Sequence, residues 1–114
     1  MSTCVIERAG DGRHYPRKGE VVSIHYILKL KNQDGKIIDQ TYTRGKPFTF
    51  KVGSGQVVRG WDEVVKQLSV NEKARCKIPA DSAYSSKGFP GLIPPNSELY
   101  VEVELLSIVQ PELE

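Results

Sequence analysis

The sequence is poor in the side chains that most often carry metal, redox or nucleophilic chemistry. Its 114 residues include only two cysteines and two histidines. Cys4 and Cys76 lie far apart and neither belongs to a Cys-x-x-Cys pair, so no disulfide framework or zinc motif is indicated. His14 falls in a predicted turn and His25 on the polar face of a predicted strand, without the partners that a catalytic triad needs. We therefore expect no metal and no cofactor.

Long hydrophobic runs and a strong excess of one charge are absent too. No stretch approaches the ~20 apolar residues of a membrane span, and the first residues lack the apolar segment of a signal peptide. The formal net charge is +2, and no cluster of lysine and arginine indicates a nucleic-acid surface. We expect a cytoplasmic protein, with the nucleus also open to it, that binds neither membranes nor nucleic acid, and we take it as a monomer. In a reducing compartment, Cys4 and Cys76 are expected to be free thiols.

What is present is an ordinary globular mixture. Hydrophobic residues make up 39% and charged residues 26% of the chain, which excludes disorder and collagen-like structure for its body. A length of 114 residues suits one compact domain with its own core. We place this domain at residues 10–108, after an N-terminal strand or extension at 1–9 and before an acidic tail at 109–114.

Alternation of apolar and polar residues predicts β-strands along most of the chain. The clearest case runs from Val22 to Leu30, where every second residue is apolar and Ile27 is the exception. Asp-Gly turn chemistry at residues 32–35 follows, so the chain is expected to return as a partner strand. The predicted strands are 3–7, 22–30, 36–43, 48–52, 73–78 and 99–105.

A single stripe of apolar residues at helical period predicts one short helix. The stripe consists of Trp61, Val64, Val65 and Leu68. A helix of about two turns does not persist alone in water, so it must pack on a sheet. Strands joined by turns and interrupted by one helix indicate an α+β fold with a mostly antiparallel sheet.

Regular pattern is missing between residues 81 and 97. Structureless loops of this length are uncommon in compact domains and are usually functional or disordered. The large apolar side chains within this loop are Tyr84, Phe89, Leu92 and Ile93. Because disordered linkers rarely carry such a group, we favour an ordered loop that covers or lines a site.

Several short blocks are spaced from about Gly10 to Ile108 as they are in one known family. The blocks are Gly10-Asp11-Gly12, His25-Tyr26, Lys46-Pro47-Phe48, Val57-Val58-Arg59-Gly60-Trp61-Asp62-Glu63, Ala83-Tyr84, Pro90-Gly91 and Ile93-Pro94-Pro95. Through them the chain resembles the FKBP-type peptidyl-prolyl isomerases. The family fold is a twisted, mostly antiparallel sheet of about five strands wrapped around one short helix, which agrees with the α+β pattern above.

The resemblance implies an apolar pocket between the helix and the sheet. Trp61 would form its floor and Asp39 would be its carboxylate, and Tyr26 and Tyr84 would act with them in catalysis. Further substrate and ligand contacts would come from Ile38, Phe48, Gln56, Val57, Val58, Phe89, Ile93 and Val101. Without the resemblance, Trp61 would be an ordinary core residue and Asp39 an exposed charge at a strand end.

The implied reaction is cis/trans isomerisation of X-Pro bonds in peptides and folding proteins. It needs no nucleophile, metal or cofactor, because the barrier arises from amide resonance. The alternative is a non-catalytic module that docks proline-containing partner proteins through the same pocket. The same residues serve both functions.

The resemblance also implies binding of the macrolides tacrolimus and rapamycin, with calcineurin as a partner of the drug-bound protein. Ile38 and Val101 stand where small human-type members carry phenylalanine, and Ser85 replaces a glycine that commonly follows the Ala-Tyr pair. The loss of two aromatic rings predicts weaker macrolide binding than in members with a fully aromatic pocket.

Overall fold

Strands dominate the computed structural model, which describes residues 1–109; the rest of the predicted tail lies outside the described residues. The strands are β1 (Thr3–Arg8), β2 (Val21–Leu30), β3 (Ile37–Gln40), β4 (Phe48–Lys51), β5 (Lys73–Ile78) and β6 (Leu99–Val109). The helices are α1 (Thr41–Arg44) and α2 (Arg59–Val65), and the long loop contains the 3-10 turns η1 (Ala80–Ser82) and η2 (Ser85–Lys87). Each predicted strand has its counterpart, and β6 runs beyond the predicted end at residue 105.

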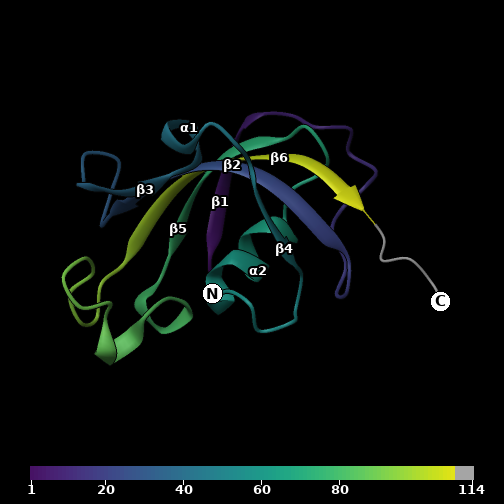
Figure 1. The fold of residues 1–114 in the computed structure, drawn as a ribbon. Coiled ribbons are helices and arrows are strands. Elements are labelled where there is room, and N and C mark those ends of the chain that lie inside the picture. Colours follow the sequence, from purple (N-terminus) through teal and green to yellow (C-terminus); the bar gives the residue numbers. More distant parts are fainter. Residues whose placement is uncertain (110–114) are drawn as a thin grey trace.

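The strands form one antiparallel sheet in the order β1-β5-β6-β2-β3, with β4 also paired to β2. The longest strands, β2 and β6, pair from Leu30 opposite Leu99 to Val21 opposite Val109. Figure 1 shows them arching over α2, which lies on the concave side of the sheet. The predicted fold is confirmed, with six strands in the sheet instead of about five.

The hydrophobic core fills the space between α2 and the concave face of the sheet. It includes Val22, Ile24, Trp61, Val64, Val65, Ile78 and Leu105. The strand residues alternate between the two faces, so the apolar set of each strand meets the helix. Gly60 lets α2 approach β5 closely, because a Cβ atom at this position would collide with the side chain of Ile78.

The predicted helix is present but shorter than its apolar stripe. α2 ends at Val65, and Leu68 lies beyond it with its side chain fully buried in the core. The N–H groups of Gln67 and Leu68 bond three residues back, which is the tighter pattern of a helix end. The apolar stripe therefore predicted the buried residues correctly, but it extends beyond the end of the helix. Within residues 1–109, no helix is long and apolar enough to cross a membrane.

The predicted return strand at residues 36–43 is wrong in its second half. β3 ends at Gln40, and the next four residues form the single turn α1. Thr41 fixes this turn against β2, because its buried Oγ1 accepts a hydrogen bond of 2.9 Å from the backbone N–H of Tyr26. Gly45 ends the turn in the left-handed region at φ 72°, which glycine adopts without steric cost.

The prediction that Cys4 and Cys76 are free thiols is also wrong. β1 pairs with β5 in a register that sets Cys4 directly opposite Cys76, and a disulfide joins them. The sequence did not predict this contact, because the two cysteines are 72 positions apart and only strand order and register bring them together. The bond fixes the edge strand β1 covalently to the sheet.

Glu63 ties the start of the chain to α2. Its Oε1 accepts hydrogen bonds of 2.7 Å from the backbone N–H and from the hydroxyl of Ser2, and its Oε2 accepts one of 3.1 Å from the Ser82 hydroxyl. Burial alone would raise the pKa of Glu63, but these hydrogen bonds stabilise the carboxylate and hold its pKa below the usual value. The N-terminal segment, α2 and the long loop therefore meet at one side chain.

Candidate active site

A cavity of about 550 Å³ opens between α2, the strands β2 to β4 and the start of the long loop. It is lined by Tyr26, Leu28, Asp39, Phe48, Gly55, Gln56, Val57, Val58, Trp61 and Tyr84. The strands supply the first four of these residues, and the segment between β4 and α2 supplies the next four. Asp39 is the only carboxylate among the lining residues, so the surface that a ligand meets is mainly apolar.

Three aromatic rings form the floor and one wall of the cavity. Trp61 is 7% exposed, so its indole belongs to the core and still reaches the cavity surface. The ring of Tyr26 lies against it, with centroids 4.8 Å apart and planes at 57°. Phe48 meets Tyr26 edge-on at 6.0 Å. Tilted and edge-on contacts are the favoured packing of aromatic rings, so they hold this apolar surface in place.

A polar cluster of Tyr26, Asp39 and Arg44 lies at the rim of the cavity. The Tyr26 hydroxyl donates to Asp39 Oδ2 at 2.6 Å, and Arg44 Nη1 donates to Asp39 Oδ1 at 2.5 Å. Arg44 Nη2 also donates to the Tyr26 hydroxyl oxygen at 3.2 Å. Burial raises the pKa of Tyr26, and the hydrogen bond to Asp39 raises it further. The phenol therefore stays protonated at neutral pH and keeps donating to the carboxylate.

Tyr84 brings the long loop into the site. Tyr84 lies between η1 and η2 in the chain and lines the cavity. Burial raises the pKa of Tyr84, and the nearby Asp39 carboxylate raises it further. Phe89 packs edge-on against Tyr84, with ring centroids 5.7 Å apart. The Phe89 N–H donates to the Ile93 carbonyl at 2.7 Å, which closes a tight turn. The loop is therefore an ordered segment that contributes Tyr84 to the cavity.

Most of the predicted contact residues line this cavity, and four do not: Ile38, Phe89, Ile93 and Val101. Val101 is 0% exposed, and it lies with Ile93 in the same core cluster as Trp61. Ile38 is half-buried and packs against the edge of the core. Phe89 contacts the lining residue Tyr84, and Phe89 is 47% exposed.

Three residues at the site were not predicted from the sequence. Leu28 and Gly55 line the cavity, and Arg44 binds the Asp39 carboxylate. Leu28 could have been found, because period two puts it on the same face of β2 as Tyr26. Arg44 could not, since five residues of extended strand would separate it from Asp39 by roughly 16 Å. The unpredicted turn α1 brings the two side chains together.

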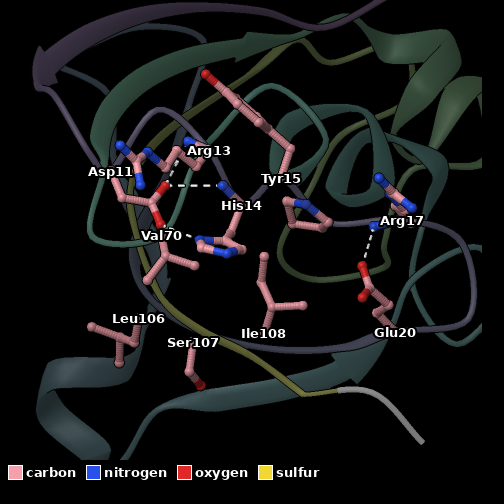
Figure 2. A pocket seen from close by; sticks show the side chains of 11 residues that line it. Asp11, Arg13, His14, Tyr15, Arg17, Glu20, Val70, Leu106, Ser107 and Ile108 are labelled. Atoms are coloured by element: carbon pink, nitrogen blue, oxygen red, sulfur yellow. Dashed lines mark hydrogen bonds and ion pairs between the residues drawn. The ribbon is translucent and has the colours of Figure 1, made fainter.

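A larger cavity, of about 670 Å³, lies between the loop 11–20 and the end of β6. Figure 2 shows the Asp11 carboxylate at its edge, facing His14. Asp11 accepts hydrogen bonds from the backbone of Arg13 and His14 and contacts the His14 ring, which lowers the pKa of Asp11 to about 2. These bonds fold the loop on itself and give the cavity a charged rim, and the rings among its lining residues include those of His14 and Tyr15. Within residues 1–109, no group of His, Cys, Asp or Glu could hold a metal ion.

Comparison with known proteins defines the class. A model of the FKBP-type peptidyl-prolyl cis-trans isomerases matches residues 12–106. The chain is 50% identical over 99 residues to FK506-binding protein 1 of Saccharomyces cerevisiae, a match that covers 87% of this chain and 85% of the relative. It is also 50% identical over 99 residues to the peptidyl-prolyl cis-trans isomerase Fkbp12 of Drosophila melanogaster, covering 87% of this chain and 90% of the relative. The chain therefore belongs to the FKBP-type peptidyl-prolyl cis-trans isomerase family, as its motifs predicted.

Proposed function

We propose that this chain catalyses cis/trans isomerisation of X-Pro bonds in peptides and folding proteins, within the cavity whose floor is Trp61. The observation that carries the proposal is the composition of that cavity. Its wall and floor are aromatic and aliphatic, and its one carboxylate, Asp39, is already bound by Tyr26 and Arg44. An apolar proline ring can lie against Trp61 without displacing a hydrogen bond.

An apolar cavity accelerates this reaction because it binds two states of the amide unequally. The barrier of ~18–20 kcal/mol comes from resonance that is broken when the bond twists. The twisted amide is less dipolar than the planar one, so it loses less when it leaves water. Selective binding of the twisted form lowers the barrier, and each ~1.4 kcal/mol of preference increases the rate about tenfold.

Polar groups at the rim hold the peptide on both sides of the reacting bond. Val58 and Tyr84 both line the cavity, and we assign the Tyr84 hydroxyl and the backbone N–H of Val58 to the substrate carbonyl groups. Asp39 orients the Tyr26 hydroxyl through their 2.6 Å hydrogen bond. The catalytic residues are then Trp61, Tyr26, Asp39 and Tyr84, and neither a nucleophile nor a cofactor takes part.

We propose that tacrolimus (FK506) and rapamycin bind in the same cavity, and that the drug-bound protein offers a surface to calcineurin. Support comes from the names of FK506-binding relatives and from the apolar lining. One chain supplies both the apolar lining and the polar rim of the cavity, and we propose that the protein acts as a monomer. Small human-type members of the family carry phenylalanine at the position of Ile38. Macrolide binding is therefore expected to be weaker here than in members with a fully aromatic pocket.

A protease-coupled isomerisation assay with tacrolimus tests this function. Catalytic amounts of protein should raise the rate of cis-to-trans conversion above that in buffer, and tacrolimus in excess should remove the increase. A folded sample that binds tacrolimus but leaves the rate at the buffer value would support the alternative, a non-catalytic module for proline-containing partners.

The cytoplasmic location, with access to the nucleus, stays a prediction. The disulfide between Cys4 and Cys76 bears on it, because disulfides persist mainly in oxidising compartments. Fractionation of cells followed by blocking and counting of thiols tests both points together. Protein from the cytosolic fraction with two free thiols would retain the predicted compartment and show that the disulfide forms only on oxidation.

A further inference from the structure

A second hollow, of about 490 Å³, adjoins the candidate active site. It shares Tyr26, Asp39 and Phe48 with the first cavity, so the two adjoin at these side chains. Its other lining residues are Arg44, Lys46, Pro47 and Thr49. A peptide that sets its proline on the Trp61 floor and remains extended can therefore place a flanking residue in this hollow. We call the hollow the flanking groove.

The charges of the flanking groove are unbalanced. Asp39 is its only carboxylate, and Arg44 Nη1 already pairs with it at 2.5 Å. Lys46 is exposed, and none of the ion pairs within residues 1–109 includes it. The neighbouring cavity adds no further charged side chain. One ammonium group therefore stands at the groove without an acidic partner in the described part of the chain.

We propose that the flanking groove is a substrate subsite that favours an acidic residue near the X-Pro bond, and that Lys46 is its specificity-determining residue. This inference rests on the proposed isomerase function and names the substrate class that the same site prefers. The carboxylate of a substrate Asp or Glu pairs with the Lys46 ammonium. Arg44 contributes less to this preference, because its guanidinium is held by Asp39 and by the Tyr26 hydroxyl.

The expected preference is modest because the pair is exposed to water. Exposed ion pairs are worth ~0.2–1 kcal/mol, so an acidic peptide should be favoured roughly 1.4-fold to fivefold over its neutral counterpart. The preference should shrink at about 1 M salt, where the screening length falls to ~3 Å.

The test uses two series of peptides with one Leu-Pro centre. In one series, Glu, Gln or Lys stands two residues before the proline, and in the other it stands two residues after it. Exchange NMR gives kcat/KM for each peptide, and chemical-shift titration gives its Kd. The variants are Lys46→Gln, Lys46→Glu and, as a matched control, Lys66→Gln, which removes an exposed lysine at the end of α2 that lines neither cavity.

The wild type and Lys66→Gln should favour the Glu peptide over the Gln peptide in at least one series. Lys46→Gln should handle these two peptides equally, and Lys46→Glu should favour the Lys peptide. Equal handling by the wild type in both series, or a preference for Glu that survives in Lys46→Gln, overturns the subsite. Catalysis of no peptide would contradict the isomerase function instead, and the ratio of Kd values would then decide the subsite by the same criteria.

Discussion

Removal of the Cys4–Cys76 disulfide should destabilise the protein strongly and leave its catalysis in place. The bond joins residues 72 positions apart, and a crosslink that closes a loop of this length removes on the order of 4 kcal/mol of chain entropy from the unfolded state. That is a large share of the ~5–15 kcal/mol by which small domains are stable. The bonded cysteines lie on β1 and β5, outside the residues that line the cavity.

The assay is urea unfolding of the wild type and a Cys4→Ser variant, each with and without reductant. The wild type should lose about 2–4 M in its urea midpoint on reduction, given a slope of ~1–2 kcal/mol per M for a small domain. Cys4→Ser should match the reduced wild type and should not respond to reductant, while both keep their kcat/KM at 10 °C within about twofold, where the folded state still predominates. An unchanged midpoint in reductant, together with two free thiols in the untreated protein, would show that Cys4 and Cys76 do not pair.

Three further predictions concern the site and its supports. Asp39→Ala and Tyr84→Phe should lower kcat/KM by about tenfold or more, because both side chains line the cavity. The urea midpoint of each variant should stay close to that of the wild type, because neither side chain belongs to the buried core. Unfolding of either variant at room temperature would contradict the assignment of that residue to the site. Ile38→Phe should strengthen tacrolimus binding by roughly twofold to tenfold, because one aromatic contact adds ~0.5–1.5 kcal/mol. Val101→Phe should instead overpack a fully buried position and cost ~1–3 kcal/mol of stability. Calorimetric titration measures the affinities and urea unfolding the stabilities, and equal gains in affinity from the two variants would show that Val101 faces the ligand. Glu63→Gln should lose about 1–3 kcal/mol at pH 7. Because the pKa of Glu63 is lowered on folding, its contribution is present above the unfolded value of 4.5 and lost as pH falls through the folded value, so the variant should show a weaker loss of stability in acid than the wild type.

The strands were predictable because period two is a local signal. The alternation from Val22 to Leu30 predicted β2, apart from its first residue, and the face of β2 that meets the helix. The residues of β5 were predicted in full. The stripe that begins at Trp61 marked α2 for the same reason. Motif spacing, and not periodicity, identified Asp39 and Tyr84 as site residues, because a strand-end carboxylate and a loop tyrosine carry no local pattern.

Contacts between distant segments explain what the sequence did not reveal. Thr41 belongs to a helical turn because its hydroxyl meets the backbone of Tyr26, a contact that strand propensity does not encode. Cys4 and Cys76 pair because of the order of strands in the sheet. Val101 was predicted as pocket wall, and its period gave the correct face of β6 but not its depth, since a strand pattern cannot tell a residue at the cavity surface from one behind it.

The proposed function of this cavity is to accelerate exchange between the two isomers of an X-Pro bond. Its most direct measurement is exchange NMR on a short peptide with Leu before Pro, because the spectrum reports cis and trans populations and their interconversion at equilibrium without a coupled protease. Uncatalysed exchange takes tens to hundreds of seconds. Catalytic amounts of the wild type should bring exchange well below one second while the populations stay unchanged, and equimolar tacrolimus should restore the slow rate. A folded protein that leaves the exchange rate at its buffer value would contradict the account.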